Sequence, residues 1–213
     1  MKTEEFIGAL AGGVEAVDPA QLRRRSLGAL ALGSSLAAAL SAGLLRLNPV
    51  LLHLGTEPRF WVREAFCVTL SLMGITAVHR LGRPGRPLGV VPLGVAAPVG
   101  VMWALAALAL ISVPPSARLP LILGHTARAC PFLITLLAVP PFAAFVWILR
   151  GLAPTRLRLA GAAAGFAAGA LGALAYTLHC PELAAPFVGV WYLLGMLIPA
   201  TLGAGMGPRL LRW

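Results

Sequence analysis

Residues 159–178 read LAGAAAGFAAGALGALAYTL and contain no charged side chain. A helix needs about 20 apolar residues to cross the roughly 30 Å hydrocarbon core of a bilayer, so this run predicts a membrane-spanning helix. Gly161, Gly165 and Gly169 recur at every fourth residue, with mostly alanine between them. Small residues at this spacing let two helices approach closely where lipid supplies no hydrophobic drive. We expect this glycine face to pack against another helix of the same chain in preference to a second copy.

The composition of the whole chain is that of a membrane protein. Hydrophobic residues make up 59% of the 213 residues and charged residues 11%, with a mean hydropathy of +0.87, whereas an ordinary soluble domain is about 25% charged. Five further apolar runs are long enough to span a bilayer: 26–45, 60–78, 88–113, 129–149 and 186–206. We therefore predict an all-α polytopic membrane protein with six transmembrane helices in residues 26–206. Residues 1–25 form a polar N-terminal tail and residues 207–213 a short C-terminal tail.

The basic residues predict how these spans are oriented. With the N-terminus inside, twelve Lys and Arg residues fall in cytoplasmic segments and five in outer segments. Since cytoplasmic loops carry the excess of Lys and Arg, both termini are expected in the cytoplasm. The net charge of +10 is spread in small groups between the apolar runs, which is typical of topology signals and not of a surface that binds nucleic acid. We expect a lipid bilayer around the chain and no direct binding of nucleic acid.

The N-terminal tail carries an amphipathic pattern that ends at Asp18-Pro19. A threonine can cap a helix whose first turn is acidic, and apolar residues then recur on one side. The residues of this pattern are Thr3, Glu4, Glu5, Phe6, Ile7, Leu10 and Val14. Two interpretations stay open. The tail is either a frayed segment whose arginines only set topology, or a short helix that docks its apolar face in the groove of a partner.

Two Cys-Pro steps lie at the edges of apolar runs, on the outer side of this topology. Cys130-Pro131 opens the fourth run and Cys180-Pro181 follows the fifth. Because proline favours the first turn of a helix or a tight bend, we expect each thiol at such a place, near water. The two thiols are either small packing residues, a redox pair that closes a disulfide if the Cα atoms lie within about 7 Å, or metal ligands.

The metal hypothesis adds His125, His179 and Glu182 as ligands beside Cys130 and Cys180. The five-residue spacing between His125 and Cys130 would require a loop and not a helix face. Elsewhere, Cys67 is expected to be a buried packing residue of the second run, and His53 and His79 are expected to be interfacial residues.

Enzyme motifs do not occur in the sequence. It contains no C-x-x-C, no G-x-S-x-G, no H-E-x-x-H and no glycine-rich phosphate loop. We expect no catalytic residues and no cofactor, apart from a metal ion as a signal. No run carries Asp or Lys near its middle, and Arg63 and Glu64 lie near the outer end of the second run, so a proton or ion relay lacks carriers. A small transporter or channel subunit, with the outer Cys and His groups as a metal entry site, is the alternative.

Several parts of the chain together resemble the NrsF family of bacterial inner-membrane anti-sigma factors. These parts are the start Met1-Lys2-Thr3-Glu4-Glu5-Phe6-Ile7-Gly8-Ala9-Leu10, the run Arg23-Arg24-Arg25, the six spans, Cys130-Pro131, His179-Cys180-Pro181-Glu182 and the stretch from Trp191-Tyr192 to Pro199. The resemblance implies that the cytoplasmic tail binds an extracytoplasmic-function (ECF) sigma factor and holds it inactive. It also implies that Cys130 and Cys180 are a sensor pair for metal or oxidant stress, while Cys67 has no counterpart.

Overall fold

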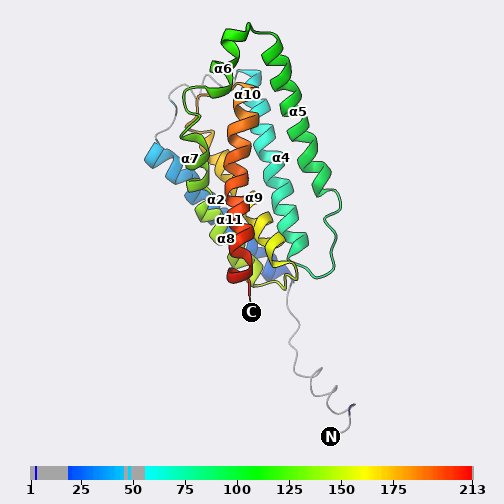
Figure 1. The fold of residues 1–213 in the computed structure, drawn as a ribbon. Coiled ribbons are helices and arrows are strands. Elements are labelled where there is room, and N and C mark those ends of the chain that lie inside the picture. The colour runs from blue at the N-terminus through cyan, green and yellow to red at the C-terminus, as the bar shows by residue number, and fades with distance from the viewer. Residues whose placement is uncertain (1–2, 4–18, 46–47, 49–55, 213) are drawn as a thin grey trace.

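The computed structural model describes Thr3, residues 19–45, Asn48 and residues 56–212, and the regular elements in these ranges are all helices (Figure 1). The α-helices are α2 (Pro19–Leu40), α4 (Pro58–Leu81), α5 (Val91–Ile111), α6 (Pro115–Leu123), α7 (Cys130–Leu137), α8 (Val139–Arg150), α9 (Leu157–Tyr176), α10 (Ala185–Phe187) and α11 (Leu193–Leu210). Two π-helical turns, η1 (Ser41–Leu45) and η2 (Val188–Tyr192), continue α2 and join α10 to α11. The predicted all-α class is confirmed.

Several helices are long and apolar enough to cross a membrane. Among the described residues, these are Arg24–Leu45, Pro58–Leu81, Val91–Ile111, Leu157–Tyr176 and Ala185–Leu210. The pair α7 and α8 passes the same test if the two are taken as one broken span, with a bend of 42° between them. Each of these segments overlaps one of the six apolar runs of the sequence. The start of α2 and the end of α11 lie at the same end of the bundle (Figure 1).

The bend between α7 and α8 follows from two adjacent prolines. Pro140 and Pro141 have no N–H group, so the hydrogen bonds that they would otherwise donate to the carbonyls of the preceding turn are missing. The helix therefore breaks at Ala138, whose N–H still reaches the Ile134 carbonyl at 2.9 Å. Regular bonding resumes when the Phe142 N–H donates to the Ala138 carbonyl at 2.9 Å.

The helix α9 is the centre of the bundle. Of its most apolar window 72% is buried inside the protein, against 6% for α5. It packs against α4, α7, α8 and α11, and only a helix made mostly of Gly and Ala can accept so many neighbours at short range. By contrast, α5 buries only Val91 and Met102 and forms the outer wall of the bundle (Figure 1).

The glycine face of α9 packs against α11, as expected for an internal neighbour. A methyl group added at Gly161 would collide with the carbonyl of Gly203, and one at Gly165 would collide with the carbonyl of Pro199. At Gly169 the added carbon would lie 2.8 Å from the Met196 Cα atom. The two backbones are therefore in direct contact along the seam, and no side chain larger than hydrogen fits at these three positions.

The sequence predicts no helix between the apolar runs 88–113 and 129–149, where the prolines favour a loop. The structure differs, because Pro115–Leu123 form the helix α6. Pro115 occupies the first turn of α6, where its missing N–H has no cost. The helix ends at Gly124, which has a φ of +53° and is followed by the segment that leads to Cys130.

Candidate functional site

Cys130 is the first residue of α7, as the Cys-Pro step predicted. Pro131 lies in the first turn, and the Cys130 N–H donates to the Thr126 carbonyl at 2.9 Å. The expectation that this thiol lies near water is wrong, because Cys130 is fully buried. The α6–α7 connection folds inward at this point, and a small thiol is readily enclosed by α9 and η2.

Cys180 lies in the turn that follows α9 and is also fully buried, again contrary to the expectation of water contact. Its N–H and that of His179 both donate to the Tyr176 carbonyl at 3.0 Å. The Sγ atom of Cys180 is 3.8 Å from the Thr126 Oγ1 atom. Since Thr126 also accepts the Cys130 N–H, one residue contacts both cysteine segments.

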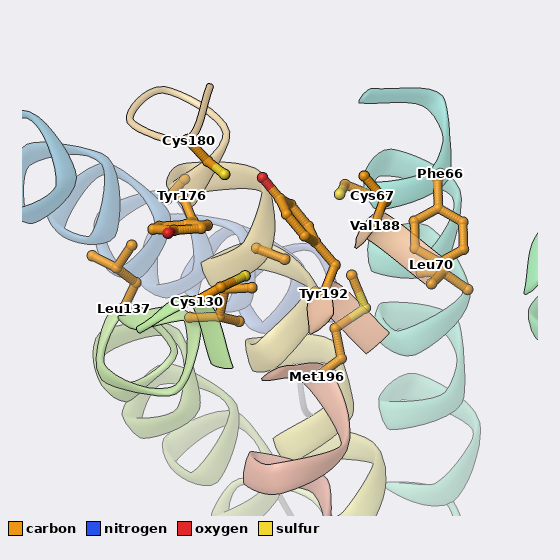
Figure 2. Packing of buried hydrophobic residues seen from close by; sticks show 14 of the residues in the cluster. Phe66, Cys67, Leu70, Cys130, Leu137, Tyr176, Cys180, Val188, Tyr192 and Met196 are labelled. Carbon is orange, nitrogen blue, oxygen red and sulfur yellow. The ribbon is translucent and has the colours of Figure 1, made fainter. Parts of the chain in front are cut away.

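Cys67, Cys130 and Cys180 belong to one buried cluster at one end of the bundle (Figure 2). All three are free thiols. In the view of Figure 2, Tyr192 stands between Cys67 on one side and Cys130 and Cys180 on the other. The prediction of Cys67 as a buried packing residue is confirmed. Its place in the same cluster as the other two cysteines was not predicted.

Two tyrosines give this apolar cluster a polar interior. Tyr176 of α9 and Tyr192 of η2 are fully buried, with ring centroids 5.9 Å apart. The Tyr192 hydroxyl has no hydrogen-bond partner within the described part of the chain, whereas the Tyr176 hydroxyl lies near the side chains of Thr126, Cys130 and Cys180. An unsatisfied buried hydroxyl costs about 1–3 kcal/mol. The packing around the thiols therefore includes a tyrosine hydroxyl that could form a better hydrogen bond if the surrounding helices were rearranged.

Arg63 of α4 holds the Cys180 segment in place. Its side chain is 1% exposed, and its guanidinium has five N–H donors. Nη1 donates to the carbonyls of Cys180 at 2.9 Å and Glu182 at 3.2 Å, and Nη2 donates to the carbonyl of Thr177 at 3.3 Å. The remaining two donors reach the Glu64 carboxylate at 3.2 and 3.3 Å. Every donor of Arg63 is thus used, and three of them fix residues 177–182.

Glu182 joins the two cysteine segments to each other. Its Oε1 atom accepts the His125 N–H at 2.8 Å and lies 3.1 Å from the His125 Nδ1 atom. The positive φ of Gly124 directs the chain toward this carboxylate, and an added carbon at Gly124 would lie 2.8 Å from the Glu182 Cδ atom. His125 and Glu182, both considered as metal ligands, therefore meet as an interloop pair.

The other predicted site residues are placed as follows. His179 lies beside Tyr176, with ring centroids 5.8 Å apart, and His79 is exposed. Within the ranges that the structure describes, no three His, Cys, Asp or Glu side chains are grouped so that they could hold a metal ion, so the metal hypothesis stays a prediction. In the tail pattern, Thr3 is exposed, and Glu4, Glu5, Phe6, Ile7, Leu10 and Val14 lie outside the described residues, as does His53.

Comparison with known proteins gives a full-length match. The family model described as NrsF, negative regulator of sigma F, matches residues 10–213. A protein of Azospira oryzae named probable anti-sigma-F factor NrsF is 46% identical over 213 residues, covering all of both chains. A protein of Caulobacter vibrioides named anti-sigma-F factor NrsF is 38% identical over 220 residues, again covering both chains completely.

The chain belongs to the NrsF family. Membership confirms the family resemblance of the sequence and identifies the chain as a relative of negative regulators of a sigma factor, a regulatory and not a catalytic family. No solved structure matches the NrsF chain. Sequence reasoning missed Arg63 as a site residue, although an arginine inside an apolar run was the available signal.

Proposed function

We propose that this chain is a six-span protein of the bacterial inner membrane that holds an ECF sigma factor inactive through residues 1–25. Modification of Cys130 and Cys180 by oxidant or metal stress releases the sigma factor. Family membership supports the sigma-factor partner. The long apolar helices support the membrane location, and the excess of arginine at one end of the bundle supports two cytoplasmic termini.

One observation carries the sensing part of this proposal. Two cysteines that are far apart in sequence are buried in one cluster, and the segment of one of them is anchored to a spanning helix by Arg63. Closing a disulfide removes both thiol hydrogens and passes two electrons to the oxidant. Binding a soft metal ion replaces the two thiol protons with the metal. Either change draws the two sulfurs together and displaces residues 177–182 on Arg63.

The hydrogen bonds between Arg63 and residues 177–182 are strong enough to account for release of the sigma factor. To take the bound sigma factor from about 99% to about 1%, the two sensor states must differ by roughly 5.5 kcal/mol in their preference for it. A buried hydrogen bond from a charged donor contributes about 1.5–3 kcal/mol. Three such bonds join Arg63 to residues 177–182, so their rearrangement is of the required size.

The test uses a sigma-dependent reporter in cells that carry the full chain. Phe6→Ala/Ile7→Ala/Leu10→Ala keeps every tail charge and should turn the reporter on without stress, because the apolar face of the tail is lost. Cys130→Ser/Cys180→Ser should keep the reporter off under oxidant or metal exposure, whereas the control Cys67→Ser should respond normally. A silent reporter in the tail variant would refute tail binding. A normal response of the double serine variant would refute the sensor assignment, and solute flux in reconstituted vesicles would favour a transporter.

A further inference from the structure

Charge is strongly segregated along the bundle. One end, where α4, α8 and α11 end and α5 and α9 begin, carries ten arginines: Arg24, Arg25, Arg80, Arg83, Arg86, Arg150, Arg156, Arg158, Arg209 and Arg212. The carboxylates of the described residues, Glu57, Glu64 and Glu182, all lie at the opposite end. None of the ten arginines forms an ion pair within the described ranges. Among the described residues, this end therefore carries a net positive charge that no carboxylate offsets.

Three of these arginines line a cavity at this end of the bundle. It has a volume of about 290 Å³ and lies between the α4–α5 turn and the segment before α9. Arg83, Arg86 and Arg156 line it together with Thr155. The side chains of Arg80 and Arg150 donate to backbone carbonyls, whereas these three guanidinium groups have no carbonyl partner among the described residues. Their guanidinium groups are exposed and available to a ligand.

The wall of the cavity is shaped by the backbone of the α4–α5 turn. Gly85 lines the cavity with a φ of +73°, a conformation that other residues adopt only with strain. The Arg80 Nη1 atom donates to the Pro87 carbonyl at 3.1 Å and closes the turn. The cavity is thus formed before any ligand binds, which reduces the entropy cost of binding.

Apolar residues continue the cavity toward the spanning helices. Leu81 ends α4, Leu88 precedes α5, and both line the cavity. Next in the chain, Val90 precedes α5 and Leu93 lies in its first turn, and both are exposed, while α5 itself buries little surface. The site therefore combines three guanidinium groups with a path for hydrocarbon, at the level where the apolar helices end. A phosphate binds guanidinium groups through paired charge-assisted hydrogen bonds, and a phospholipid carries the hydrocarbon as well.

We propose that this cavity binds the phosphate headgroup of an anionic glycerophospholipid, with an acyl chain lying along α4 and α5. The ligand places negative charge among these arginines and fixes the α4–α5 turn against the start of α9. Basic pockets at the cytoplasmic side of spanning helices are suited to such headgroups. This inference depends on the membrane placement of the proposed function, but not on the sigma factor or on the cysteines.

The experiment measures lipid retention by the full chain in neutral detergent, by native mass spectrometry with added phosphatidylglycerol or phosphatidylcholine. Arg83→Gln/Arg86→Gln/Arg156→Gln should weaken phosphatidylglycerol retention by roughly 100-fold, because each of the three lost charged contacts contributes about fivefold. The control Arg24→Gln/Arg158→Gln/Arg209→Gln removes equal charge at the same end and should retain phosphatidylglycerol. Equal melting temperatures of the two variants without anionic lipid establish that both fold.

Three results would overturn the proposal. Equal loss of lipid in the control would show a diffuse charge effect and no site. If inorganic phosphate or glycerol phosphate raises the melting temperature as much as the lipid does, the ligand of the cavity is a soluble phosphate. The third result is that the cavity variant retains lipid normally but no longer binds purified sigma factor in neutral-lipid discs, while the control variant still binds it. That result would assign these arginines to the protein partner. In each case the reporter test of the tail and cysteines stands independently.

Discussion

At the scale of single residues, Arg63 is a charged side chain that is almost completely buried in the described structure. Its charge lies within the apolar helix α4 and is neutralised by the adjacent Glu64, while all five N–H donors are satisfied. Removing one partner of such a buried pair costs about 3–5 kcal/mol, because the other charge remains without compensation. Arg63 is thus a positioning residue for Cys180.

We predict that Arg63→Gln releases residues 177–182 and exposes Cys180. The variant should lose roughly 3–5 kcal/mol of stability, and its Cys180 thiol should react with a maleimide far faster than that of the unmodified chain. Arg59→Gln, on the same helix but at an exposed position, is the matched control and should change neither. Labelling of Cys180 in a Cys67→Ser/Cys130→Ser background isolates the signal. If Arg63→Gln leaves Cys180 as protected as before, the anchor does not hold this segment.

The positions of Cys130 and Cys180 relative to the helices could be predicted from the sequence, but their burial and the acceptors of Arg63 could not. The Cys-Pro steps predicted where Cys130 and Cys180 lie along the chain, because proline has strong local preferences. They could not predict burial, which depends on how α9, η2 and the 177–182 segment enclose the thiols. Likewise, the acceptors of Arg63 are backbone carbonyls more than 110 residues away in sequence, and carbonyls carry no residue-specific signal.

At the scale of elements, the seam between α9 and α11 is the closest contact of the bundle. The four-residue spacing of the glycines predicted a packing face on α9. The apolar runs of the sequence predicted each of the long apolar helices. Neither could name α11 as the partner, because small residues fit any helix that offers a flat face. The helix α6 was missed since its prolines, Pro115 and Pro120, are typical of loops, although the first lies where a helix tolerates it.

We predict that Gly165→Ala separates α9 from α11 and destabilises the protein by about 1–3 kcal/mol, the usual cost of overpacking. The added methyl group meets the Pro199 carbonyl, which belongs to the helix backbone and cannot move alone. Gly100→Ala in α5 adds the same group in a helix where nothing lies within 4 Å and should be neutral. The midpoint of thermal unfolding in detergent measures both. Equal midpoints would mean that the seam accommodates a methyl group.

At the scale of the whole molecule, the segregation of arginines and carboxylates to opposite ends sets the expected orientation. The ten arginines at one end should face the cytoplasm, and the thiol cluster should lie near the outer surface. We predict that a cytoplasm-active fluorescent reporter is bright when fused after residue 213 or in the 82–90 turn. A periplasm-active phosphatase should be active when fused after Arg118 and inactive after Arg86. The reverse pattern would place Cys130 and Cys180 at the cytoplasmic side and would contradict the proposed orientation.

The buried position of Arg63 has a consequence for how the protein is made. The carbonyls that Arg63 contacts, those of Thr177, Cys180 and Glu182, are translated more than 110 residues after it. Until then the guanidinium has only its neighbours on α4, the Glu64 carboxylate and the Phe60 ring. The final environment of a residue in the first third of the chain therefore depends on the last third. A chain that ends before residue 177 would lack all three carbonyls and would leave three of the five Arg63 donors without the partners that they have in the folded protein.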